Sequence, residues 1–264
     1  MSSTDNRGVD ESSPEHSTVS RVRRVRHELQ RRHCTVRHVQ ALGPGFVRIQ
    51  LASESLRSFT SLSFDDHVKV FFPQPAGTAA QDQPTMRNYT PRAFDTEAGT
   101  LDLEFALHGH GPASRWAATA QPGDTLDIGG PRGSMIIPGD FDWHLLAGDE
   151  SALPAIARRL EELPAGVVVA ALLTTRDPAN RRDLPTRANL TVHWLDDAPG
   201  ALAKAASAWA VPAGEGYAWA AAEASEIAML RQVLIGPLGL HKAQVRASAY
   251  WKRGSDAHHE TLDS

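Results

Sequence analysis

The distribution of apolar residues changes near Pro138, and this change constrains the fold more than any other feature of the sequence. Before it, short runs rich in β-branched and aromatic residues are separated by turn residues. After it, apolar runs alternate with segments of helical period. The first pattern is typical of a small antiparallel barrel or sandwich, and the second predicts a parallel sheet covered by helices. A chain of 264 residues is long enough for both domains.

The first half of the chain is predicted to form about six short strands. They are expected at 34–40, 46–52, 67–73, 87–92, 100–108 and 124–130. One helix is expected at 112–119, and Pro122 with Gly123 supplies the fixed φ and the positive φ of a type II turn before the last strand. The predicted fold class is therefore a six-stranded antiparallel β-barrel followed by an α/β domain with a parallel sheet.

The second half is predicted to alternate strands with helices. Strands are expected at 143–150, 166–175, 190–195, 217–223 and 245–251, and helices at 151–163, 201–210 and 225–234. Ser151, which follows two acidic residues, is a candidate N-cap for the first helix. Ligands of parallel sheets bind beyond the carboxyl ends of the strands, so a site is expected there.

Residues outside these two patterns are predicted to form tails and a lead-in segment. Residues 1–20 are polar and acidic, so a disordered tail is expected. Residues 21–32 carry six arginines, and Val22, Val25 and Leu29 have helical spacing, which favours a solvated lead-in helix over a site for an anionic partner. The expected boundaries are a tail at 1–20, a barrel at 21–138, an α/β domain at 139–254 and a tail at 255–264.

Charge and cysteine content exclude several classes of function. The net charge of −4 provides no global basic field, so no nucleic-acid partner is expected. The single cysteine, Cys34, excludes an internal disulfide, and one thiol cannot hold an iron–sulfur cluster or a thiolate zinc site. Redox chemistry would therefore need an organic cofactor. No secretory signal and no run of about 18 apolar residues is found, so a cytoplasmic protein without a membrane span is expected, with a monomer as the default state.

The run at 87–92, RNYTPR, is the first candidate binding motif. In an extended segment Arg87 and Tyr89 share one face, and Asn88 and Thr90 share the other. A flat aromatic ring, a hydroxyl and a cation suit a flavin, because they can stack on its ring, bond to its edge and pair with its phosphate. The alternative is ordinary surface packing of a strand.

Two glycine-rich segments are further candidates. In the run at 108–116, glycines precede a helix start whose free N–H groups could face a pyrophosphate. His108 and His110 lack supporting carboxylates or cysteines, which favours loop residues over a metal site. The segments at 129–134 and 148–156 close the barrel and open the α/β domain. No GxGxxG motif is present, so a standard dinucleotide fingerprint is not supported.

Taken in order, these segments resemble the siderophore-interacting protein family, also called ferric-siderophore reductases, a branch of the ferredoxin-reductase-like flavoproteins. The resemblance covers roughly residues 33–254. Each segment is common alone, whereas the ordered set is specific. The set is DDHVKVFFP (65–73), RNYTPR (87–92), LHGHGPASRWA (107–117), PGDTLDIGGPRGS (122–134), WHLLAGDESALPAIARRLEELP (143–164), WAAAEAS (219–225) and AYWKRG (249–254).

The resemblance implies FAD in the barrel and NAD(P)H in the second domain, with hydride passing to the flavin and single electrons to ferric iron. The residues that it implies for the flavin ring and adjoining chain are Arg87, Tyr89 and Thr90. Those implied for the ribityl and diphosphate path are His108, Gly111, Ala113 and Ser114. Those implied to border the nicotinamide nucleotide are Asp149, Glu150 and the run at 222–225, with Glu223 and Ser225.

Two departures from the family pattern affect these expectations. Ala222 stands where the family usually has glycine, which adds a methyl group where a ligand would approach. Arg176, Arg181 and Arg182 follow the second α/β strand, in a stretch that is usually acidic in the family. A 2′-phosphate needs cationic forks, so the arginines predict a preference for NADPH over NADH, with an exposed basic loop as the alternative.

Many ferric siderophores are polyanions, so cations are expected beside the flavin. Lys69, Arg132 and Arg253 are predicted to line one pocket, with Lys252 as the substitute for Arg253. The alternative is ordinary surface charges with packed aliphatic stems. The predicted function is NAD(P)H-dependent reduction of ferric siderophores through FAD, releasing ferrous iron in the cytoplasm. The alternatives are a general flavin or ferredoxin-type reductase and a siderophore-binding protein without redox activity.

Overall fold

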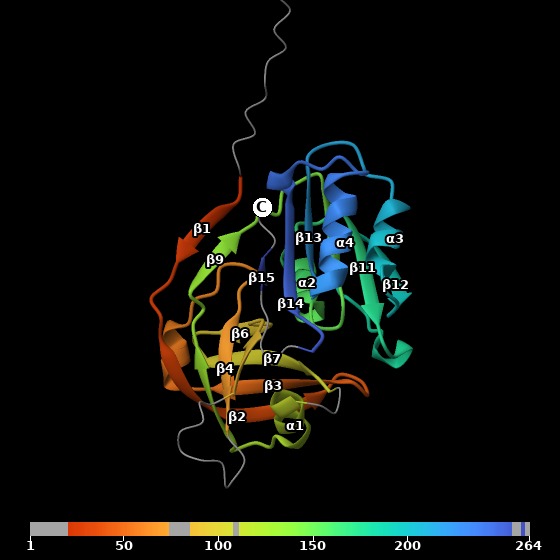
Figure 1. Ribbon diagram of the computed structural model, residues 1–264. Helices are drawn as coiled ribbons and strands as arrows, with labels where there is room; N and C mark the ends of the chain where they lie inside the picture. The colour runs from red at the N-terminus through yellow and green to blue at the C-terminus, as the bar shows by residue number, and fades with distance from the viewer. Residues whose placement is uncertain (1–20, 74–84, 108–110, 255–259, 262–264) are drawn as a thin grey trace, which may run out of the picture.

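The computed structural model describes residues 21–73, 85–107, 111–254 and 260–261. The predicted tail at 1–20, His108 and most of the predicted tail at 255–264 lie outside these residues. The described chain forms an antiparallel sheet that curls on itself and a parallel sheet covered by helices (Figure 1). The fold class predicted from the sequence is therefore confirmed.

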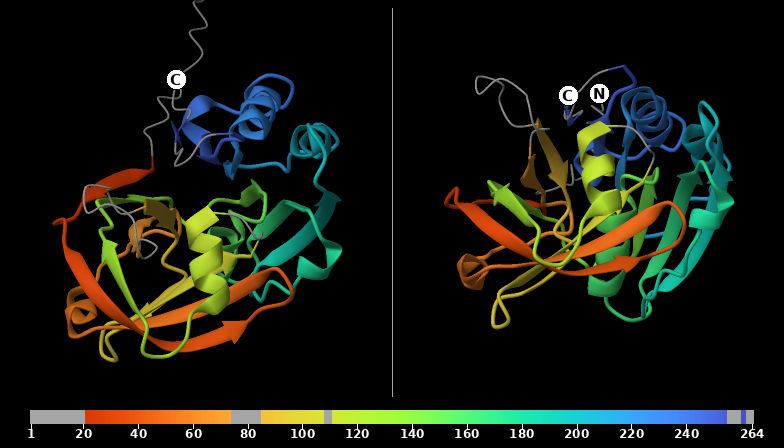
Figure 2. Two further views of the ribbon diagram at one scale, coloured as in Figure 1. Left: turned by 60° about the horizontal axis from the view of Figure 1, so that its bottom comes forward. Right: turned by 90° about the horizontal axis from the view of Figure 1, so that it is seen from below.

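The antiparallel sheet has seven strands in the order β5-β4-β8-β2-β3-β7-β6. Its core follows the alternation of the sequence, since Val68, Val70 and Phe72 of β4 are buried while the residues between them are not. Helix α1 lies against the curled sheet (Figure 2), where Trp116 packs on Phe72 with ring centroids 5.9 Å apart. The strands are β2 (Arg31–Ala41), β3 (Phe46–Ala52), β4 (Val68–Phe72), β5 (Thr85–Tyr89), β6 (Ala93–Asp95), β7 (Thr100–Ala106) and β8 (Thr125–Gly129), and the helices are η1 (Glu54–Ser58) and α1 (Gly111–Thr119).

One detail differs from the predicted six-stranded barrel. Within the described residues the sheet has seven strands, because the three-residue strand β6 adds to the edge of β7. No pairing between β5 and β6 joins the two edges in this part of the chain. The architecture is therefore a curled, open half-barrel, and β5, which carries the first candidate motif, is an edge strand.

The predicted lead-in helix at 21–32 is wrong. Residues Arg23–Arg26 form strand β1, which pairs antiparallel with β9 (Gly133–Ile136) in a two-stranded ribbon. Gly133 permits this pairing, because a Cβ there would stand 2.4 Å from the carbonyl oxygen of Val25. The segment therefore forms a strand because it pairs with a partner strand that lies more than a hundred residues away.

The parallel sheet has five strands in the order β12-β11-β10-β13-β14, with the short antiparallel β15 beside β14. Helix α2 packs on one face together with Phe64 of the first domain, and helices α3 and α4 pack on the other. The elements are β10 (Trp143–Gly148), α2 (Leu153–Glu162), β11 (Val168–Thr175), η2 (Pro178–Asn180), β12 (Asn189–Asp196), α3 (Ala201–Ser207), β13 (Gly216–Glu223), α4 (Ala224–Ile235), η3 (Lys242–Gln244), β14 (Val245–Trp251) and β15 (Glu260–Thr261).

The strand order places a topological switch point between β10 and β13. The chain leaves β10 toward β11 on one side, and β13 lies on the other, so the two connections diverge at their carboxyl ends. Gly148 allows a close approach there, because a Cβ would stand 2.5 Å from both the Ala221 carbonyl oxygen and the Ala152 methyl group. Gly148 therefore lets β10, β13 and the turn before α2 pack closely at the switch point.

Buried polar side chains join the two domains. Asp65 accepts a hydrogen bond from the indole Nε1 of Trp219 over 3.0 Å and pairs with Arg246. Arg158 of α2 donates to both the hydroxyl and the carbonyl oxygen of Ser61. These contacts fix the curled sheet against the α/β domain. No helix among the described residues is long and apolar enough to cross a membrane.

Candidate functional site

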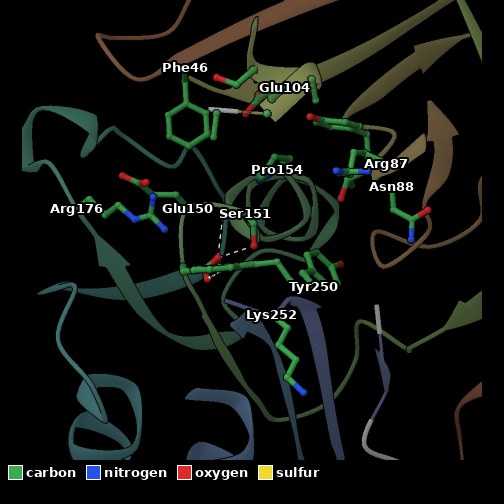
Figure 3. Close-up of a pocket in the computed structure, with 18 of the residues that line it drawn as sticks. Phe46, Arg87, Asn88, Glu104, Glu150, Ser151, Pro154, Arg176, Tyr250 and Lys252 are labelled. Atoms are coloured by element: carbon green, nitrogen blue, oxygen red, sulfur yellow. Dashed lines mark hydrogen bonds between the residues drawn. The ribbon is translucent and has the colours of Figure 1, made fainter. Parts of the chain in front are cut away.

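A cavity of about 630 Å³ lies between the curled sheet and the carboxyl ends of the parallel strands (Figure 3). Its size is that of an ordinary ligand or cofactor site, about 300 to 1,000 Å³. Both domains line it. The first domain contributes Phe46, His67, Arg87, Asn88, Tyr89, Thr90, Glu104, Ala106, Gly111, Pro112, Ala113 and Ser114. The second contributes Asp149, Glu150, Ser151, Pro154, Thr174, Arg176, Asp197, Tyr250, Trp251, Lys252, Arg253 and Gly254.

Strand β5 brings the first predicted motif to this cavity. Its register pairs Tyr89 with Val68 and Arg87 with Val70, which are both core residues, so these two side chains share the inner face as predicted. The ring of Tyr89 packs on Phe105 with centroids 4.3 Å apart. Burial, partly offset by Arg87, raises the pKa of the Tyr89 hydroxyl, which therefore stays protonated as a hydrogen-bond donor.

Helix α1 contributes its N-terminus to the cavity. Gly111 has a φ of +79°, and a Cβ there would meet no atom within 4 Å, so its backbone faces open space. Ala113 lines the cavity beside it, and the buried Ser114 lies in the first turn. Free N–H groups of a first helical turn attract anionic groups such as phosphate. His108, predicted for the same path, lies outside the described residues.

This combination of groups fits FAD. Tyr89 offers an aromatic ring, Thr90 a hydroxyl, Arg87 a cation and α1 a set of N–H groups that are open to the cavity. Figure 3 shows Arg87 and Asn88 on the barrel side of the cavity, opposite Arg176 and Glu150. A flavin ring, a ribityl hydroxyl chain and a diphosphate need these donor types in this kind of enclosed space.

Asp149 is the centre of a hydrogen-bond cluster at the end of β10. Its Oδ1 accepts from the backbone N–H of Ser151 over 2.9 Å and from its hydroxyl, and its Oδ2 accepts from the Glu223 N–H over 3.0 Å and from Trp251 Nε1 over 2.7 Å. Burial raises the pKa of Asp149, against the effect of these donors. The carboxylate thereby ties together the ends of β10, β13 and β14.

The predicted N-cap role of Ser151 is wrong. Helix α2 begins at Leu153, its N-cap residue is Ala152, and no side chain caps it. Ser151 lies in a turn before the helix and donates its hydroxyl proton to Asp149. Asp149, which precedes the helix in the sequence, is therefore the hydrogen-bond acceptor in this turn, and Ser151 is the donor.

Of the three predicted nucleotide-site residues Glu150, Glu223 and Ser225, one lines the cavity. Glu150 lines the cavity and accepts from the hydroxyl of Thr175 over 2.8 Å and from the side-chain amide of Asn180. Glu223 and Ser225 are not among the lining residues. Instead, Glu223 caps α4, where its carboxylate accepts from the N–H and the hydroxyl of Ser225. Burial raises the pKa of Glu223, but these hydrogen bonds outweigh it and the net pKa is lowered.

The three arginines after β11 are separated in the structure. Arg176 lines the cavity, lies 5.4 Å from the ring centre of Trp251 and pairs with Asp197 at 3.4 Å. Arg181 pairs with Asp196, away from the cavity lining. The third, Arg182, crosses to the first domain and contacts Glu104. Of the three, Arg176 is the one that a cavity ligand can reach within the described structure.

Glu104 forms a charged cluster on the barrel wall of the cavity. Its carboxylate is fully buried and pairs with Arg48 at 2.6 Å, with Arg92 at 3.3 Å and with Arg182. Burial raises the pKa of Glu104, but the guanidinium groups of Arg182 and Arg48 reverse the shift and hold the net pKa below its usual range. Because Arg182 belongs to the α/β domain, the cluster also links the domains beside the cavity.

The four predicted substrate cations do not all meet at the cavity. Lys252 and Arg253 follow β14 and line it. Lys69 pairs in the sheet with Asn88, a lining residue, and Arg132 lies in the connection between β8 and β9, but neither is part of the cavity lining. Of the four predicted substrate cations, Lys252 and Arg253 are therefore the two that line the cavity.

Several lining residues were not assigned from the sequence. Trp251 and Tyr250 stood inside the quoted run at 249–254, and a hydrogen bond between Tyr250 and Thr90 joins the two domains across the cavity. Asp197 directly follows β12, so the rule that ligands bind at carboxyl ends of parallel strands could have found it. Glu104 had no such signal, because it reads as the polar position of an alternating strand.

Comparison with known proteins adds two family matches and several relatives. Residues 35–135 match the family model described as siderophore-interacting FAD-binding domain, and residues 141–254 match that described as siderophore-interacting protein. The NADPH-dependent ferric-chelate reductase of Escherichia coli is 36% identical over 244 residues, which cover 86% of this chain and 95% of the relative. The ferric vibriobactin reductase ViuB of Vibrio cholerae is 31% identical over 236 residues, covering 81% and 87%.

The same likeness extends to a solved structure. A siderophore utilization protein from T. fusca superimposes with a TM-score of 0.83 at 33% sequence identity. The match covers 90% of this chain and 99% of the other. Both domains and their arrangement are therefore shared.

Proposed function

The chain belongs to the siderophore-interacting protein family, and from this premise we propose that it is an NADPH-dependent ferric-siderophore reductase that works through bound FAD. One observation carries the proposal. One cavity brings the groups of β5 and α1 to the switch point of the parallel sheet, where a nicotinamide nucleotide would bind. The relatives from Escherichia coli and Vibrio cholerae are named as ferric reductases.

In this proposal the curled sheet holds the flavin. Tyr89 and Thr90 would hold the ring, Arg87 would pair with phosphate, and Gly111 and Ser114 would approach the diphosphate through the first turn of α1. Bound FAD supplies the conversion between hydride chemistry at the nicotinamide and single-electron reduction of ferric iron. The contribution of the protein is to position the reactants, so no side chain is assigned as a nucleophile or as an acid or base.

The carboxyl ends of β10, β11 and β14 would hold the nucleotide. The Asp149 cluster fixes the backbone around the switch point, and its bond to Trp251 sets the position of an aromatic ring on the cavity wall. Arg176, which lines the cavity, would pair with a 2′-phosphate. Glu223 and Ser225 would act on this site from behind, by holding the end of β13 and the N–H of Arg253.

A ferric siderophore would meet the flavin from the side that carries Lys252 and Arg253. A polyanionic chelate is attracted by such local cations even though the net charge of the protein is −4. Lys69 and Arg132 would extend this attraction outside the cavity. Each hydride carries two electrons, so one NADPH would reduce two ferric ions, and we assign the release of ferrous iron to the cytoplasm, where NADPH is available.

The visible spectrum of the purified protein tests the proposal. We expect flavin absorption that bleaches when NADPH is added under argon and returns when a ferric siderophore is added, with ferrous iron trapped by a chelator. A protein that binds ferric siderophore without flavin absorption would be a binding module instead. Reoxidation by free flavin or a one-electron carrier, but not by ferric siderophores, would indicate a general reductase.

A further inference from the structure

Two arginine–aspartate pairs stand next to each other at the carboxyl ends of β11 and β12. The parallel register aligns Thr175 with Asp196, so the residues that follow each strand are neighbours. Arg176 pairs with Asp197 at 3.4 Å, and both line the cavity. Arg181 pairs with Asp196 at 3.5 Å, and neither lines it. The two pairs have the same chemistry, but one alone faces the cavity.

The two members of the cavity pair favour different nucleotides. In dinucleotide-binding sheets a carboxylate near the end of the second strand accepts a hydrogen bond from the ribose 2′-hydroxyl of NADH, whereas an arginine accommodates the 2′-phosphate of NADPH. Here Arg176 follows that strand, β11, and Asp197 reaches the same place from the end of the neighbouring β12. A carboxylate near a 2′-phosphate repels it, and a carboxylate paired with the arginine also competes for the same guanidinium. Arg176 and Asp197 therefore oppose each other in selecting the nucleotide.

The exposure of the pair allows it to change partners. The side chain of Arg176 is 51% exposed and that of Asp197 is 40% exposed. An ion pair this open to solvent is weak, so an incoming phosphate can displace the carboxylate. Figure 3 shows Arg176 beside Glu150, whose Oε1 is already bound by Thr175 and Asn180. Glu150 is therefore held in place, while Asp197 is the carboxylate that the arginine can exchange for a phosphate.

We propose that Asp197 is a specificity-determining residue, which restrains Arg176 from the 2′-phosphate of NADPH and accepts the 2′-hydroxyl of NADH, so that the protein uses both nucleotides. This inference rests on the proposed NAD(P)H-dependent reductase function. Asp197 acts on NADPH through Arg176, and its contribution to NADH is direct.

The test compares D197N, R176Q, the double variant and the matched control D196N in the flavin-loaded protein. The readouts are kcat/KM for flavin reduction by NADPH and by NADH, and Kd for 2′,5′-ADP and for 5′-AMP by calorimetry. D197N should raise the NADPH/NADH ratio of kcat/KM about fivefold, the scale of coupling in an exposed ion pair, through a lower KM for NADPH at unchanged kcat. It should tighten 2′,5′-ADP binding by a similar factor and weaken 5′-AMP binding, because 5′-AMP keeps the ribose 2′-hydroxyl and a neutral amide accepts its hydrogen bond less strongly than the carboxylate does.

R176Q should lower the NADPH/NADH ratio of kcat/KM. Adding D197N to R176Q should not lower KM for NADPH, because the arginine through which Asp197 acts on NADPH is gone. D196N should match the wild type in both readouts. An unchanged ratio and unchanged 2′,5′-ADP affinity in D197N would overturn the inference. If the wild-type protein accepts hydride from neither nucleotide, the proposed function fails instead, so the two failures are distinct.

Discussion

The indole N–H of Trp251 donates to the Asp149 carboxylate over 2.7 Å, which links the end of β14 to the end of β10 across the intervening β13. The Glu223 N–H, at the end of β13, donates to the same oxygen. One carboxylate thus joins three strand ends at the point where the parallel sheet opens. The wall of the cavity depends on this joint, because Trp251 and Asp149 are both lining residues.

Replacing Asp149 by asparagine should destabilise the protein. The two carboxylate oxygens accept from four donors, and an amide would present its own NH₂ to two of them. We expect a loss of about 1 to 3 kcal/mol in the free energy of unfolding, the penalty for an unsatisfied buried group. Urea denaturation measures it. Trp251→Phe, which removes one donor and keeps the carboxylate, is the control and should lose less; equal stability of D149N and wild type would contradict the role of the cluster.

Flavin binding should depend on Arg87 and Tyr89. The double variant Arg87→Ala, Tyr89→Ala should fold but purify colourless, because stacking and phosphate pairing are both removed. Tyr89→Phe keeps the ring that packs on Phe105 and should stay yellow. Circular dichroism checks folding, and flavin absorption per protein checks binding. Full flavin content in the double variant would refute the assignment.

Glu104 should make stability depend on pH. Its pKa in the folded protein lies below the ordinary value of 4.5, so its contribution is present above pH 4.5 and is lost as the pH falls through the lowered value. Glu104→Gln removes the counter-charge of Arg48 and Arg182 at a buried position and should lose about 3 to 5 kcal/mol at neutral pH.

The control for this prediction is Glu161→Gln. Glu161 pairs with Arg92 in the same cluster, but its side chain is 42% exposed, so the loss should not exceed about 1 kcal/mol. Urea midpoints between neutral pH and about pH 3 measure both effects, and the gap between wild type and E104Q should narrow on acidification. A gap that stays constant would show that the charge of Glu104 is not the cause.

Substrate affinity should depend on the predicted cations. Alanine at Lys252 or Arg253, and at Lys69 or Arg132 outside the cavity, should raise KM for an anionic ferric siderophore, and the increase should shrink as salt screens the field. Flavin content and flavin reduction by NADPH should remain near wild type. Lys204→Ala on α3 is a surface control. Unchanged KM in all four variants would remove the basic-pocket prediction and leave the reductase proposal standing.

Local patterns predicted most elements, and the failures have physical causes. The strand predicted at 46–52 coincides with β3, because Val47, Ile49 and Leu51 alternate with polar residues. The strand pairs with β2 on one side and with β7 on the other. The segment at 21–32 failed because Val22, Val25 and Leu29 also fit a helical stripe. Its strand partner β9 is remote in sequence, and local periodicity carries no information about a remote partner.

Site residues could be predicted from the sequence where they directly follow the end of a strand. They were harder to predict where a tertiary partner determines which way the side chain points. The motif positions Arg87, Tyr89 and Thr90 lie on the same cavity as Asp149 and Glu150, although their roles remain predictions. Arg182 was grouped with Arg176 by proximity in sequence, yet it contacts Glu104 in the other domain. Arg176 and Arg182 both follow β11, yet one pairs with Asp197 and the other crosses to the first domain. Only these tertiary partners show which arginine reaches the cavity.

The cavity draws its lining from Phe46 to Gly254, nearly the whole length of the chain, and this order matters during synthesis. The curled sheet leaves the ribosome first, with Arg87, Tyr89 and α1 already in sequence, and domains generally fold as units in that order. Trp251, Lys252 and Arg253 follow more than a hundred residues after α1. A nascent chain thus completes the cavity wall of its curled sheet before that of its α/β domain, and the two-sided site exists only after translation has passed β14.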